Sequence, residues 1–182
     1  MHSACSGKDR VESRPFCVIS GGQTGVDRGA LDAALSLGVP CGGWCPAGRA
    51  AEDGVIPARY PVIALRDAGY GERTVKNVED SDGTLIITFG PASGGTARTI
   101  DVCRTLGCPH LIMDATTVSL EEAVGRAVRF VREEDIRRLN VAGPRASGEP
   151  RGYEYACSLV RELCLRCGVS QSRGPPSQPS SP

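Results

Sequence analysis

The stretch Cys17-Val-Ile-Ser-Gly-Gly-Gln-Thr-Gly-Val-Asp-Arg-Gly-Ala-Leu31 predicts a strand, a glycine-rich turn and a helix in direct succession. Residues 16–19 form an apolar run with the length and β-branched content of a buried strand. After the turn, the apolar residues take the one-faced spacing of an amphipathic helix, at Val26, Ala30, Ala33, Ala34 and Leu37. The turn over 20–25 therefore joins the carboxyl end of a strand to the amino end of a helix.

A turn in this position can bind an anion, because free N–H groups and the positive end of the helix dipole point the same way. Glycines there let a phosphate approach the backbone, and we expect free N–H groups from Gly21 to Gly25. The turn lacks a Walker A lysine and the dinucleotide G-x-G-x-x-G spacing, so a plain tight turn is the alternative. The polar residues in and after the glycines favour a ligand loop: Gln23, Thr24, Asp27 and Arg28.

Length and composition limit the possible functions. The 182 residues suit one domain, and the formal net charge of zero gives no basic field for nucleic acid or an anionic membrane. Eight aromatic residues are too few to favour base-stacking platforms. No run of about 18 apolar residues occurs, so we expect a cytoplasmic chain with no membrane partner. The nine cysteines are an odd number spread along the chain, which favours free thiols.

The rest of the chain alternates between strand and helix patterns. We predict a single ligand-binding domain over 15–167, a disordered lead-in over 1–14 and a disordered Ser/Pro-rich tail over 168–182. Strands are predicted at 61–65, 83–89, 109–114 and 136–141, and helices at 71–79, from 97, from 119 after a Ser119 cap, and at the end of the domain. This alternation predicts an α/β fold, with helices on both faces of a mostly parallel sheet.

Three predicted strand ends carry glycine-rich turns, at residues 20–25, 90–96 and 142–148. In a parallel sheet the carboxyl ends of the strands meet at one edge, where ligands bind. We therefore expect one composite site that uses Gly94, Gly95 and Thr96 of the second turn with Gly143, Pro144 and Arg145 of the third. An arginine in such a turn can bind a phosphate with two hydrogen bonds.

Two further segments carry candidate residues. A long loop is predicted over 44–60, and its lone Trp44 together with Arg49 suggests a function. On the 71–79 helix, Arg73, Thr74 and Asn77 share a face that points either to solvent or into a ligand crevice.

These motifs closely resemble the putative molybdenum carrier family, which includes the molybdenum-cofactor carrier proteins. The matching segments are 20–29, 42–49, 51–57, 73–74, 77–78, 81–85 with Asp82, 94–96 and 139–145, within about 17–165. The resemblance implies a Rossmann-like three-layer fold related to the cytokinin-activating phosphoribohydrolases and the lysine-decarboxylase-like proteins. It also implies a homo-oligomer, a dimer or tetramer, that binds the phosphorylated pterin of the molybdenum cofactor (molybdopterin).

One departure from the related phosphoribohydrolases separates the chain from their chemistry. Those enzymes carry a Glu three residues after the Gly-Thr of this turn, whereas Thr99 stands there in this chain. A hydroxyl cannot supply the missing carboxylate, so we do not expect the hydrolysis to carry over.

No nucleophile–base constellation appears in the sequence, which favours a carrier or binding protein over an enzyme. The alternative is a protein that binds or hydrolyses a nucleotide or an ADP-ribose-like ligand, with Asp27, Asp53 or Asp82 as acid or base. No metal site is predicted, because Cys41-x3-Cys45 and Cys164-x2-Cys167 lack a complementary pair at zinc spacing. Cys45 stays a candidate ligand-loop thiol.

Overall fold

The structure is a computed structural model that describes residues 15–168. The predictions of a disordered lead-in over 1–14 and of a disordered tail, apart from Gly168, lie outside the described residues.

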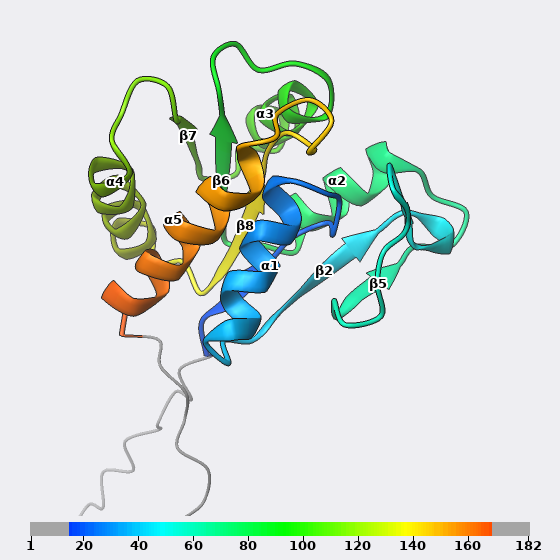
Figure 1. Ribbon diagram of the computed structural model, residues 1–182, viewed down its shortest axis with the longest axis horizontal. Coiled ribbons are helices and arrows are strands. Elements are labelled where there is room, and N and C mark those ends of the chain that lie inside the picture. The colour runs from blue at the N-terminus through cyan, green and yellow to red at the C-terminus, as the bar shows by residue number, and fades with distance from the viewer. Residues whose placement is uncertain (1–14, 169–182) are drawn as a thin grey trace, which may run out of the picture.

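Six parallel strands form the central sheet (Figure 1), which confirms the predicted α/β class. In sheet order they are β5 (Val62–Ala64), β2 (Cys41–Cys45), β1 (Cys17–Ile19), β8 (Arg138–Ala142), β6 (Gly83–Thr88) and β7 (His110–Asp114). Each neighbouring pair is parallel, and β1 at the centre pairs with β2 and β8. The 16–19 run is thus a central strand, which explains why it is apolar on both faces.

Five helices cover the two faces of the sheet, which makes the three layers of a Rossmann-like fold. One layer contains α1 (Val26–Ser36), α4 (Leu120–Glu133) and α5 (Gly152–Arg166), whose apolar residues share a core with Leu85 and Ile87 of β6. The other layer contains α2 (Tyr70–Glu79) and α3 (Gly94–Leu106), which pack with Ile86 of β6. Residues 85, 86 and 87 alternate between the two layers, as the period of a strand requires.

Helix α4 forms as its sequence predicts. The Ser119 side chain accepts a hydrogen bond from the Glu122 N–H at 3.2 Å, which satisfies one of the free donors of the first turn. One face of the helix is buried through Ala123, Val124, Ala127, Val128 and Val131. Leu120, the first residue of the helix, is 37% exposed.

The 44–60 segment is more ordered than the predicted loop. Trp44 and Cys45 belong to β2, a short 3₁₀ turn follows at Ala47–Arg49, and β3 (Ala50–Ala51) pairs with β4 (Gly54–Val55) in an antiparallel hairpin. The strand pattern was missed because Gly42 and Gly43 interrupt its apolar run.

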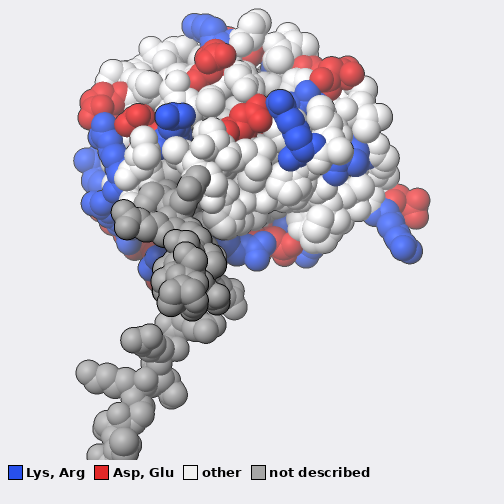
Figure 2. Space-filling model, turned by 60° about the horizontal axis from the view of Figure 1, so that its bottom comes forward, with Lys and Arg blue, Asp and Glu red and all other residues white. Residues whose placement is uncertain are grey.

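Acidic and basic side chains are interspersed on the face that Figure 2 shows, with no continuous patch of one sign. Within residues 15–168, no helix combines the length and the apolar character that a membrane span needs.

Candidate functional site

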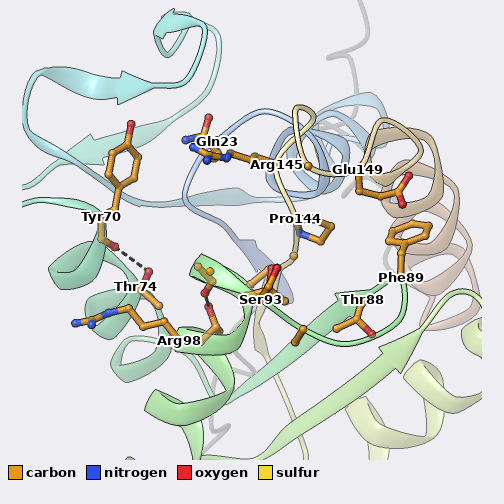
Figure 3. A pocket seen from close by; sticks show the side chains of 18 of the residues that line it. Gln23, Tyr70, Thr74, Thr88, Phe89, Ser93, Arg98, Pro144, Arg145 and Glu149 are labelled. Atoms are coloured by element: carbon orange, nitrogen blue, oxygen red, sulfur yellow. Dashed lines mark hydrogen bonds between the residues drawn. The ribbon is translucent and has the colours of Figure 1, made fainter.

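A cavity of about 560 Å³ lies at the carboxyl edge of the sheet and brings the three turns together (Figure 3). Its walls come from the ends of β1, β6 and β8 and from the first turns of α2 and α3. The lining residues are Gln23, Tyr70, Gly71, Arg73, Thr74, Thr88, Phe89, Pro91, Ala92, Ser93, Gly94, Gly95, Thr96, Arg98, Thr99, Ala142, Gly143, Pro144, Arg145, Gly148 and Glu149. The prediction that the three turns converge at one edge agrees with this arrangement.

The structure divides the predicted site residues into two groups. The cavity is lined by Gln23, Arg73, Thr74, Gly94, Gly95, Thr96, Gly143, Pro144 and Arg145. The other predicted residues do not line it: Gly21, Gly22, Thr24, Gly25, Asp27, Arg28, Trp44, Arg49, Asn77 and Asp82.

The first glycine turn is occupied by the protein's own Asp27. The Asp27 Oδ2 accepts hydrogen bonds from the Gln23 N–H at 3.3 Å and from Arg73 Nη1 at 3.2 Å, and the Gly21 N–H also donates to this carboxylate. Burial raises the Asp27 pKa, although Arg73 and these hydrogen bonds oppose the shift. The expectation of free N–H groups is therefore wrong at Gly21 and Gln23.

Two glycines of this turn serve contacts within the chain. A Cβ at Gly21 would overlap the Arg73 guanidinium, so this glycine lets Arg73 reach Asp27. Gly25 has φ of 78°, and a Cβ there would lie 2.6 Å from the Pro144 carbonyl oxygen. The glycine thus allows the first and third turns to touch.

Glu52 fastens the first turn to the third from the β3–β4 hairpin. Its carboxylate accepts from the Thr24 hydroxyl, from the Ser147 hydroxyl and from the Ser147 N–H, which lies 3.1 Å away. Arg145 Nε lies 3.4 Å from the same carboxylate. Burial works against ionisation of Glu52, but the Ser147 and Thr24 hydrogen bonds outweigh it and lower the pKa. Glu52 therefore stays charged and positions Arg145 at the cavity rim.

The second turn leaves a helix end open to the cavity. The Ser93 side chain makes no capping bond to α3, and the first turn of α3 contains no acidic residue. A Cβ at Gly94 or Gly95 would meet no atom within 4 Å, so the backbone here borders open space. A helix end with free donors and a positive dipole attracts an anion. The geometry therefore favours α3, rather than the first turn, as the anion site.

Three arginines add positive charge around this helix end. Arg73, Arg98 and Arg145 line the cavity, and among them Arg73 pairs with Asp27 and Arg145 with Glu52. Within the described part of the chain the Arg73 Nε is buried without a hydrogen-bond partner.

Three predicted site residues support the scaffold instead. Arg49 donates to the carbonyl oxygens of Ile56, Pro57, Tyr60 and Val62, which folds the segment after β4 around one guanidinium. Asn77 is buried and exchanges hydrogen bonds with the Trp44 N–H and C=O at 2.7 and 2.9 Å, which ties α2 to β2. The Trp44 indole in turn donates to Asp80.

The prediction that Asp82 lies at the composite site is wrong. Asp82 precedes β6, at the amino edge of the sheet, and accepts from the backbone N–H groups of Arg137 and Arg138. Arg28 also points away from the cavity, because it makes a bidentate pair with Asp53 at 2.6 and 2.8 Å. The cavity is therefore not lined by Asp27, Asp53 or Asp82, so none of the three can act there as an acid or a base.

Two aromatic residues that were not among the predicted site residues lie at opposite ends of the cavity. Tyr70 at the start of α2 is 49% exposed, and Phe89 follows the last residue of β6 (Figure 3). Glu149 lies beside Phe89 in the same view. Only their positions in the sequence could have predicted Phe89 and Glu149 as lining residues. Phe89 ends the predicted 83–89 strand, and Glu149 directly follows the 142–148 turn.

None of the cysteines that the structure describes lines the cavity. Cys45 is fully buried among Leu31, Ile56, Tyr60 and Val62, and this burial raises its pKa. The candidate role of Cys45 in a ligand loop is therefore wrong. The eight cysteines of the described residues are free thiols. Within residues 15–168 no three His, Cys, Asp or Glu side chains group to hold a metal ion.

Comparison with known proteins gives a family and one solved structure. The model of the circularly permutated YpsA SLOG family matches residues 18–164. The crystal structure of a "putative molybdenum carrier protein" from Syntrophus aciditrophicus SB is 41% identical, with a TM-score of 0.80. The match covers 82% of this chain and 95% of that one. A search of curated proteins found no match.

Proposed function

The chain belongs to the circularly permutated YpsA SLOG family, and from this premise we propose that it carries a phosphorylated small molecule, the phosphorylated pterin of the molybdenum cofactor. The observation that supports this most is the open amino end of α3 at Gly94 and Gly95, inside a cavity that three arginines line. The name of the Syntrophus aciditrophicus protein supports a molybdenum-related cargo.

The cavity suits the two parts of such a cargo. The phosphate would lie on the N–H groups of Gly94 and Gly95, with Arg73 and Arg145 within the same lining. The planar ring would lie against an aromatic end of the cavity. Neither His nor Cys lines the cavity, so the chain supplies no thiolate or imidazole to molybdenum there, and the metal would travel on the cofactor's own ligands.

Retention rather than turnover is the role that the lining favours. Among the described residues, Glu149 is the one carboxylate that lines the cavity, and its pair with Arg151 lowers its pKa to about 2. A carboxylate with that pKa is a weak base and is not protonated near neutral pH, so it is a poor general acid. The Thr99 hydroxyl donates to the Gly95 carbonyl oxygen at 2.9 Å and is a hydrogen-bonded part of the helix.

A nucleotide carrier is the second candidate, because the aromatic ends and the anion site would also accept a nucleoside phosphate. We expect the protein to act in the cytoplasm as a homo-oligomer, a dimer or tetramer, without nucleic-acid or membrane partners.

Native mass spectrometry of protein purified without oxygen tests the cargo and the oligomer together. We expect a mass excess that releases a phosphorylated pterin, seen by its fluorescence after oxidation, and that is reduced in a Gly95→Val variant. Gly125→Val, in the middle of α4, is the matched control because a Cβ there also meets no atom within 4 Å. A released adenine nucleotide, or a wild-type protein that binds no phosphorylated ligand, would contradict the carrier proposal.

A further inference from the structure

The Phe89 end of the cavity contains a carboxylate that an anion site does not need. Arg73, Arg98 and Arg145 give the lining a positive character, whereas Glu149 is the one acidic residue of the described chain that lines it. The Glu149 side chain is only 15% exposed. A negative charge in a phosphate pocket is unfavourable unless hydrogen-bond donors or a cation offset it.

Arg151 shows what Glu149 and Phe89 can hold. Its Nε and Nη2 donate to the two carboxylate oxygens of Glu149 at 2.8 and 2.7 Å, and its guanidinium carbon lies 5.0 Å from the centre of the Phe89 ring. Phe89 is fixed in turn by an edge-on contact with Tyr155 at 5.6 Å. A planar group with two parallel N–H donors therefore pairs with the carboxylate while it lies over the aromatic ring.

Arg151 occupies this place from the solvent side. It does not line the cavity, its side chain is 68% exposed, and it precedes α5 on the solvent side of Glu149. The pair is bidentate and therefore stronger than an ordinary exposed ion pair, but an exposed guanidinium regains its hydration when it is released. A ligand ring that enters the cavity can therefore compete with the guanidinium for Glu149 and Phe89.

We infer that Glu149 and Phe89 form a ring-reading subsite for a 2-amino-4-oxopyrimidine edge, the edge that pterin and guanine share. That edge contains a guanidine unit, with a ring N–H beside an exocyclic amino group, so it matches the donors of Arg151. Adenine presents a ring acceptor beside its amino group, and this acceptor would face the carboxylate and repel it. The subsite rests on the proposed phosphate binding and adds the identity of the ring.

Titration calorimetry with GMP, IMP, AMP, 6-hydroxymethylpterin phosphate and inorganic phosphate tests the inference. GMP and the pterin phosphate are expected to bind the wild-type protein at least about tenfold more tightly than AMP, which corresponds to one charged hydrogen bond. IMP lacks the 2-amino group and is expected to fall between them. Equal affinities for GMP and AMP would overturn the subsite and leave the phosphate proposal standing, whereas no binding of any probe would overturn the phosphate proposal.

Two variants separate the subsite from general folding effects. Glu149→Gln is expected to remove the preference for GMP over AMP, since an amide cannot accept two parallel donors. Arg151→Ala is expected to bind GMP about fivefold more tightly or better, because the guanidinium that competes for Glu149 is gone. Glu133→Gln on α4 is the matched control and is expected to keep the preference. A Glu149→Gln protein that unfolds like the wild type and still prefers GMP would refute the assignment.

Discussion

Gly95→Val should separate binding from folding. Gly95 is the second residue of α3, and a side chain there meets no protein atom within 4 Å, so we expect no steric cost. Glycine and valine differ by only about half a kcal/mol in helix propensity, so the free energy of unfolding should change by that much or less. The new methyl groups would instead occupy the space where an anion approaches the N–H groups of Gly94 and Gly95.

The expected loss of affinity follows from those two donors. Each hydrogen bond to a charged group contributes about 1.5–3 kcal/mol, so losing one or both weakens binding by about a hundredfold. At a ligand concentration of about 100 times Kd, the wild-type protein gains about 2.7 kcal/mol of stability and its Tm rises by about 5–10 °C. A hundredfold weaker variant gains only about 0.4 kcal/mol, a rise of about 1–2 °C.

Thermal unfolding with 6-hydroxymethylpterin phosphate and with GMP, at constant ionic strength, measures this difference. Gly125→Val is the control, because it makes the same change on α4 and away from the cavity. A Gly95→Val protein whose Tm rises as far as that of the wild type would show that the anion does not bind at the amino end of α3.

Three further predictions concern the scaffold and pH. Arg73→Met should lower the free energy of unfolding by about 3–5 kcal/mol, because it leaves the buried Asp27 carboxylate without its cation. In urea unfolding, the loss of stability relative to the wild type should grow as pH rises from 4 to 7. Removing Arg73 raises the Asp27 pKa further, and a group with a raised pKa in the folded state stabilises the fold only while it is protonated. An equal loss at both pH values would contradict this. In the same assay, Gly29→Ala should lower the free energy of unfolding by about 1–3 kcal/mol, because a Cβ there overlaps the Tyr153 carbonyl oxygen where α1 packs on α5. An unchanged unfolding midpoint would show that the two helices can move apart. The preference for GMP over AMP should be constant from pH 6 to 8, since the Glu149 pKa is lowered in the free protein and an ordinary glutamate is also ionised there once the ligand has replaced Arg151. Calorimetry that finds a midpoint inside this range would implicate another group.

The fold was predictable because its signals are local. The apolar run at 16–19, the Ser119 cap and the α4 stripe each specify an element from neighbouring residues, and the alternation of elements gives the parallel sheet. The three turns then converge because parallel strands share a carboxyl edge. Asp82 was misplaced because it lies next to a strand in sequence but at the strand's amino end.

The side chains that pair with the turn residues could not be predicted from the sequence, because these pairs join segments that are far apart along the chain. Asp27 and Arg73 are 46 residues apart, and Glu52 and Ser147 are 95 apart. No spacing rule connects such pairs. Arg49 was a candidate because it lies in the long loop with Trp44, and Asn77 because it shares a helix face with Arg73 and Thr74. Each instead satisfies backbone groups that the fold buries.

The contrast between the first two glycine turns has a physical cause in the helix that follows each of them. Helix α1 has Asp27 in its first turn, and this carboxylate occupies the N–H groups of the turn before it, so its positive end is already neutralised. Helix α3 begins Gly-Gly-Thr with no acidic residue, and Ser93 makes no capping bond, so its positive end stays open. The absence of a carboxylate in the first turn of the next helix therefore distinguishes the open glycine-rich turn from the occupied one. In this chain that condition selects residues 93–96, and the glycines at 21–25 let Arg73 and the third turn approach instead.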